Sequence, residues 1–281
     1  MNDIKVEITI NGNSILITPE TDIYEKIIGL KKQDKNIDRN NYNNDPDNCI
    51  ISKIIYKNIF EFYDENNCRG DTLNTYNSTF GKISNYRLKK YIKKENISIE
   101  NERLLMEKIE KFKHTYLSIG NFTILERWQK KGETPCINCS RGSFWGPIRD
   151  NWPLTLLYIQ DFLSDYKKLE KEIERNPLRD SFEKNEATKL YFSRYKNKEN
   201  GFELFCNDQY FNPKLYDNKD STYVEEDKNG NYVVKLDLFD GLNISKPLPL
   251  NLKEMEQYID KATLKIIERG KVLLNEYKKN Q

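Results

Sequence analysis

The sequence predicts an α+β protein that is mainly helical, with an N-terminal β-hairpin and a second β-hairpin before a long C-terminal helix. Two pairs of alternating apolar runs are each joined by an Asn-Gly turn, which is typical of hairpins. Several longer stretches repeat apolar residues at helical spacing. With 281 residues, of which 37% are hydrophobic and 12% aromatic, the chain can bury a sizeable core.

The first hairpin is predicted over residues 4–17, because two alternating runs flank Asn11-Gly12, which favours a type I′ turn. Asp22 and Glu25 form a capping box that predicts a short helix after the hairpin.

Residues 33–48 carry almost no apolar side chain, which indicates a solvated, mobile loop. We therefore expect a small N-terminal hairpin-helix module with this loop over residues 1–48. The main, mostly helical domain is expected over residues 49–281.

Apolar spacing and capping residues predict the other elements in order. Helices are expected over 50–62, 98–116, 151–166, 181–195 and 251–277, a short strand over 122–125, and the second hairpin from 223 to 238. The β-branched residues of 50–62 leave a strand there as the alternative. The helix after Ser98 should bury Leu104, Leu105, Ile109 and Phe112. A turn at 118–121 should place Gly120 in a left-handed conformation.

Charge and composition argue against several classes of protein. The 46 basic residues nearly balance 44 acidic ones, so overall charge does not indicate a nucleic-acid binder. No stretch has the roughly 18 to 20 apolar residues that cross a bilayer, so we expect a cytoplasmic protein without membrane contact. Five widely spread cysteines fit reduced thiols better than a disulfide framework.

Complete catalytic or cofactor motifs are absent from the sequence. It has no Gly-x-Gly-x-x-Gly and no phosphate-binding P-loop. The cofactor therefore stays unknown at this stage. Cys136 and Cys139 have the spacing of half a zinc site, but no second pair completes four ligands, so we predict no metal. His114 is the single histidine. At the end of a helix, it is expected to pack rather than to catalyse.

The candidate site consists of polar residues at the ends of predicted elements. Residues 67–80 are rich in such side chains, and further ones follow near residues 121 and 138–150. We expect Arg69, Asn74, Asn121, Arg141 and Arg149 to bind a ligand, and Asp71 and Asp150 to be catalytic, as a base or by holding a metal. Arginines beside glycines can bind a phosphate bidentately. The alternative is a buried ion-pair network that orders long loops.

Several motifs, taken together, carry a resemblance to a known family. They are Arg69-Gly70-Asp71-Thr72-Leu73-Asn74, the stretch 114–122, Asn138 with Arg141-Gly142, and Tyr258-Ile259 with Ile266-Ile267-Glu268-Arg269-Gly270-Lys271. Over roughly residues 60–275 the chain resembles a family of uncharacterised bacterial proteins. The resemblance implies a bacterial origin and a joint role for the motifs, and it assigns no activity.

The leading functional hypothesis is a bacterial protein whose polar motifs form one cleft for a phosphate-bearing ligand, a nucleotide or a nucleic-acid end. An accessory role in stress or phage defence is a further expectation. The alternative is a non-catalytic interaction module that docks a protein partner through segments such as Tyr191-Phe192-Ser193-Arg194-Tyr195. Whether the protein is an enzyme stays open at this stage.

Overall fold

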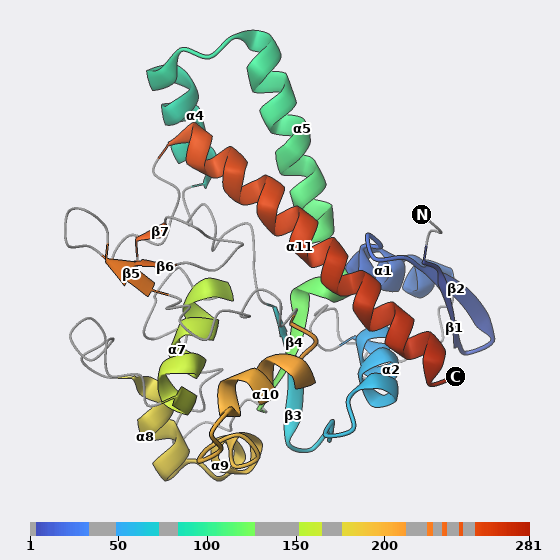
Figure 1. Cartoon of the computed structure of the whole chain (residues 1–281). Coiled ribbons are helices and arrows are strands. Elements are labelled where there is room, and N and C mark those ends of the chain that lie inside the picture. The colour runs from blue at the N-terminus through green and yellow to red at the C-terminus, as the bar shows by residue number, and fades with distance from the viewer. Residues whose placement is uncertain are drawn as a thin grey trace.

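The structure, a computed structural model, describes residues 4–33, 49–72, 84–126, 152–164, 176–211, 224–226, 232–234, 242–243 and 251–281. It is a mainly helical α+β arrangement (Figure 1), which confirms the predicted fold class. No helix in these ranges is long and apolar enough to cross a lipid bilayer. Of the loop predicted over 33–48, all but Gln33 lies outside the described residues.

The predicted N-terminal hairpin is confirmed. β1 (Val6–Ile10) pairs antiparallel with β2 (Asn13–Ile17). Asn11 and Gly12 have φ values of 50° and 79°, the left-handed backbone that both central residues of a type I′ turn need. Buried and exposed residues alternate along β1, so one face of the hairpin packs on the core.

The helix start predicted at Asp22 is also confirmed, in α1 (Ile23–Gln33). Asp22 Oδ1 accepts the backbone N–H of Glu25 at 2.9 Å. The first turn of α1 is joined to the rest of the chain as well, because the Ile23 N–H donates to the Leu117 carbonyl at 3.0 Å.

The other helices lie mostly where apolar periodicity predicts them. They are α2 (Ile50–Ile59), α4 (Ser84–Glu95), α5 (Ile99–Thr115), α7 (Trp152–Ser164), α8 (Pro177–Lys184), α9 (Glu186–Phe192), α10 (Gly201–Asp208) and α11 (Leu252–Lys279), with a 3-10 turn η2 (Ile119–Asn121). The sequence did not predict α4, which is dominated by polar residues, or the short α10.

The single helix predicted over 181–195 is wrong. Asn185 separates α8 from α9 and serves both. Its N–H donates to the Ser181 carbonyl at the end of α8, and its side chain accepts the Thr188 N–H at 2.8 Å to start α9. A short polar side chain that bonds nearby backbone groups favours such a break.

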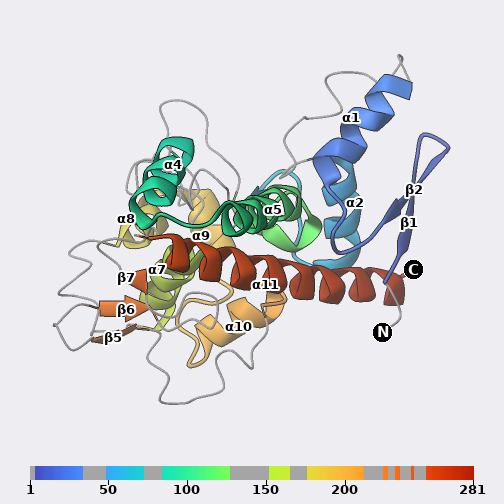
Figure 2. The same ribbon diagram turned by 90° about the horizontal axis from the view of Figure 1, so that it is seen from above.

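The longest helix, α11, crosses the whole molecule and packs against α5, α2 and η2 (Figures 1 and 2). Its buried positions recur every three or four residues over the 28 residues of the helix. The hairpin β1–β2 lies near its C-terminal end (Figure 2). A Cβ on Gly270 would lie 3.2 Å from the Pro19 carbonyl oxygen, so glycine lets the N-terminal segment approach α11 closely.

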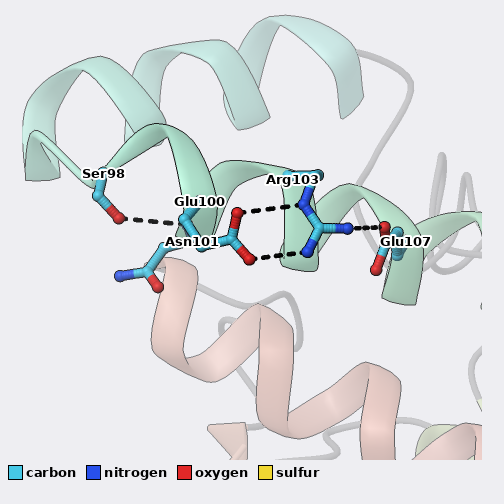
Figure 3. A network of polar contacts seen from close by, with 5 residues as sticks. All are labelled: Ser98, Glu100, Asn101, Arg103 and Glu107. Atoms are coloured by element: carbon cyan, nitrogen blue, oxygen red, sulfur yellow. Dashed lines mark hydrogen bonds and ion pairs between the residues drawn. The ribbon is translucent and has the colours of Figure 1, made fainter.

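The predicted N-cap of α5 is confirmed, and Figure 3 shows its first turns. Ser98 Oγ accepts the Asn101 N–H at 3.2 Å. Arg103 pairs with Glu100 at 2.7 Å and with Glu107 on the exposed surface. Solvent screens pairs this exposed, so they add little to the stability of the fold.

One predicted core position of α5 is wrong. Leu105, Ile109 and Phe112 are buried, but Leu104 is 43% exposed. Leu104 shares its helical face with Lys108 and Lys111, which stand at i+4 and i+7, so it belongs to the solvated face of the helix.

Two further antiparallel groups of strands complete the described fold. β3 (Cys68–Thr72) pairs with β4 (Phe122–Glu126) near the centre of the molecule. β4 confirms the predicted strand, whereas β3 was not predicted. The second hairpin is confirmed in β5 (Val224–Glu226) and β6 (Tyr232–Val234), and β7 (Leu242–Asn243) adds a third strand; its predicted Asn-Gly turn lies outside the described residues.

Candidate functional site

The β3–β4 ribbon brings three of the predicted site residues into one region. Arg69 stands opposite Leu125 and Asp71 opposite Thr123, while Asn121 directly precedes β4. Alternate residues of a strand point to the same side, so Arg69 and Asp71 share one face of the ribbon. The sequence analysis missed β3 because residues 68–72 include Arg, Gly, Asp and Thr. A buried strand usually carries apolar residues at such positions.

Asp71 and Asn121 are both buried. Asp71 is 5% exposed, and Asn121 has no exposed surface. The Asn121 side-chain amide donates to the Tyr116 carbonyl at 2.7 Å, and its backbone N–H donates to the Ser118 carbonyl. Asn121 therefore joins the end of α5 to the start of β4.

Arg69 differs from the rest of the ribbon. Of the ten residues in β3 and β4, it alone is half-buried, and the other nine are buried. Among the described residues, no hydrogen bond and no ion pair within 4.0 Å engages its guanidinium. The nearby Glu65 carboxylate pairs with Lys57 at 2.7 Å instead, and this bond is the main reason that its pKa is lowered.

The turn that leads into β3 carries Tyr63 and Phe62, and charged side chains lie near both rings. Burial, and then the Glu65 carboxylate, raise the pKa of Tyr63 to about 12, while the charge of Arg69 acts in the opposite direction. Arg194 lies over the Phe62 ring, 4.4 Å from its centroid, and its Nε donates to the Tyr191 carbonyl at 3.1 Å. Arg194 therefore lies beside the turn that leads into β3.

The rings that were expected to dock a partner are in the core. Tyr191, Phe192 and Tyr195 are each at most 1% exposed. Leu190 on the same helix is exposed, as the opposite face of an amphipathic helix should be. These aromatic side chains are therefore not available to a protein partner.

Among the described residues, the outer edge of β4 is closed by side chains and not by a third strand. Gln209 Oε1 accepts the Ile124 N–H at 3.2 Å, and Gln209 Nε2 donates to the Ile124 carbonyl at 3.0 Å. The Tyr191 hydroxyl also donates to that carbonyl. Burial raises the pKa of Tyr191 well above its usual range, which keeps this hydroxyl protonated and able to donate.

Arg269 of α11 completes this edge. Its Nη1 donates to the carbonyls of Gly120 and Phe122, and its Nε and Nη2 donate to the Gln209 carbonyl at 3.1 and 2.8 Å. The guanidinium lies over the Phe211 ring at 4.7 Å. One arginine thus ties together η2, β4, the end of α10 and α11. The sequence could have indicated this structural role, because Arg269 stands among the apolar residues that form the buried face of α11.

Gly120 is needed for close packing and not for its backbone angle. The predicted left-handed conformation is wrong, because Gly12 is the one described glycine with a positive φ. A Cβ on Gly120 would lie 2.7 Å from the Gly270 nitrogen and closer still to the Ile266 carbonyl oxygen. The motifs around Gly120 and Arg269 therefore meet at a helix-to-strand contact inside the fold.

The remaining predicted site residues lie outside the described residues. They are Asn74, Arg141, Arg149 and Asp150, together with Cys136 and Cys139. Cys49, Cys68 and Cys206 lie buried in the core.

Comparisons with known proteins give no relative. No model of a protein family, no curated protein and no solved structure matches this chain.

Proposed function

We propose that the protein binds a phosphate-bearing ligand, a nucleotide or a nucleic-acid end, and that Arg69 is the residue that contacts the phosphate. The observation that supports this is the contrast between Arg69 and Arg269. Arg269 is buried and donates to three backbone carbonyls, whereas Arg69 has no such described acceptor and reaches the surface of the same ribbon.

The position of Arg69 also suits a binding role. β3 is held by five pairs with β4, and β4 is fixed on its other side by Gln209 and Arg269. A guanidinium on such a rigid strand loses little freedom when a ligand binds, which favours affinity. Its planar donors match the geometry of phosphate oxygens.

Other site residues that the sequence predicts extend the proposal. Arg141, Arg149 and Asp150 belong to the segment that leaves β4 after Glu126, and Glu126 stands opposite Cys68, next to Arg69. In this proposal the two arginines add positive charge for binding the phosphate. Whether a reaction follows binding depends on Asp71 and Asp150.

Fluorescence polarisation tests the proposal with a short labelled single-stranded DNA carrying a 5′ phosphate, and with ATP and ADP as competitors. We expect saturable binding to the parent protein and binding weakened by roughly tenfold or more in Arg69→Ala, since a charge-assisted hydrogen bond is worth about 1.5 to 3 kcal/mol. Arg103→Ala is the matched control, because it removes the same charge from the exposed face of α5. If the parent protein binds neither DNA nor nucleotide, the interaction-module hypothesis takes precedence.

A further inference from the structure

Three potential metal ligands converge where the N-terminal helix meets the end of α5. Asp22, Glu25 and His114 each place one ligand atom within 4.8 Å of the other two. Asp22 directly precedes α1, Glu25 belongs to its first turn, and His114 belongs to the last turn of α5. The sequence hides this group, since 91 residues separate Asp22 from His114 in the chain.

The two oxygens of Asp22 have different surroundings. Oδ1 accepts the Glu25 N–H at 2.9 Å and caps α1. Oδ2 is 3.6 Å from His114 Nδ1, which is longer than a hydrogen bond. The Asp22 side chain is only 9% exposed, so this oxygen is largely withdrawn from water while it faces the imidazole. An oxygen in this position gains from a cation placed between it and the ring.

The spacing fits a transition-metal ion. Zinc bonds to histidine nitrogen and carboxylate oxygen at about 2.0 to 2.2 Å, so two donors on one tetrahedral ion lie about 3.4 Å apart. The 3.6 Å between Oδ2 and Nδ1 is close to this value. Glu25 and His114 are exposed, so their side chains can turn the short remaining distance toward an ion.

The backbone around the site is fixed. The Ile23 N–H donates to the Leu117 carbonyl at 3.0 Å, and the hydroxyl of Thr21 accepts the Thr18 N–H at 2.8 Å. The two helix ends that carry the ligands are thus held together without a metal, and an ion would add a bridge between them.

We propose that Asp22, Glu25 and His114 form a binding site for a divalent transition-metal ion, Zn²⁺ in the first place, that joins the N-terminal module to α5. One imidazole nitrogen with carboxylate oxygens suits zinc and its neighbours better than Mg²⁺ or Ca²⁺, which prefer oxygen alone. Three protein ligands leave at least one coordination position for water. The site is separate from Arg69 and does not depend on the proposed phosphate binding.

Histidine-selective NMR gives a direct test, because the chain has one histidine and its imidazole signals are unambiguous even when cysteines elsewhere take up metal. We expect Zn²⁺ to shift these signals saturably, and Ca²⁺ at the same concentration to leave them in place. Asp22→Asn and Glu25→Gln should each weaken binding by about tenfold or more, while Asn and Gln keep the helix start intact.

Glu20→Gln is the matched control, since it removes a carboxylate two residues before Asp22 and outside the group. It should bind Zn²⁺ as the parent protein does. The proposal is overturned if Zn²⁺ produces no saturable shift up to millimolar concentration, if Ca²⁺ shifts the imidazole equally, or if Asp22→Asn and Glu25→Gln both bind with the parent affinity.

Discussion

Gln209 bonds both backbone polar groups of Ile124 with one side-chain amide, at 3.2 Å to the N–H and 3.0 Å from the carbonyl. A neighbouring strand would offer the same donor and acceptor at this edge of β4. Among the described residues, the Gln209 amide therefore takes the place of a third strand. It supplies hydrogen-bond partners to the buried N–H and C=O groups of Ile124.

Replacing Gln209 should thus be costly. Gln209→Leu keeps similar bulk but removes both bonds to Ile124, and we expect a loss of about 2 to 5 kcal/mol, because buried unsatisfied groups cost about 1 to 3 kcal/mol each. Urea unfolding measures the loss. Gln257→Leu on the exposed face of α11 is the control and should stay within about 0.5 kcal/mol of the parent. Equal stability of both variants would contradict the role of Gln209.

Arg269 should not tolerate lysine. Its donors reach the carbonyls of Gly120, Phe122 and Gln209 at once, and an ammonium on a single stem cannot reproduce that fork. We predict that Arg269→Lys loses about 2 to 4 kcal/mol in unfolding free energy. Arg103→Lys on the surface of α5 should change little, and a similarly small effect at Arg269 would show that its bonds to the carbonyls contribute little.

Alanine substitutions at Gly120 and Gly29 should change stability in opposite directions, because Gly120 is closely packed and Gly29 is not. Gly120→Ala places a Cβ against the backbone of α11 and should cost roughly 3 kcal/mol. Gly29→Ala lies inside α1 with nothing within 4 Å of the new atom, so it should stabilise by about 0.5 to 1 kcal/mol. Thermal unfolding of the pair gives opposite shifts in Tm if the contact with α11 is as described, and a rise in both would contradict it.

The three cysteines in the core should react slowly. Cys49, Cys68 and Cys206 are at most 2% exposed, and burial raises the pKa of the Cys68 thiol, so little reactive thiolate is present at neutral pH. Iodoacetamide labelling followed by peptide mass spectrometry should modify these positions only after denaturant is added. Rapid labelling of Cys68 in the native protein would show that the ribbon opens readily.

Local rules predicted much of the fold. The Asn11-Gly12 turn, the caps at Asp22, Ser98 and Asn251, and the apolar stripe of α11 each depend on residues close in sequence, and all are confirmed. β3 was missed because its identity as a strand comes from pairing with β4, more than 50 residues later. No local pattern in Cys68–Thr72 contains that information.

The candidate site was also only partly predictable from the sequence, because the role of each residue depends on contacts with distant residues. The sequence singled out Arg69, Asp71 and Asn121 because of their chemistry, but it could not tell which of them the fold itself uses. Asn121 turned out to be bonded to Tyr116, while Arg69 reaches the surface. Conversely, Gln209 looked ordinary in the sequence, since its role depends on the outer edge of β4.

The most direct test of the proposed function combines binding and stability in Arg69→Ala. The guanidinium has no described hydrogen-bond or ion-pair partner, so we predict an unfolding free energy within about 1 kcal/mol of the parent. Binding of the phosphorylated DNA or nucleotide should nevertheless fall by roughly tenfold or more. A loss of several kcal/mol in stability, with binding that follows stability alone, would contradict the claim and make Arg69 a structural residue like Arg269.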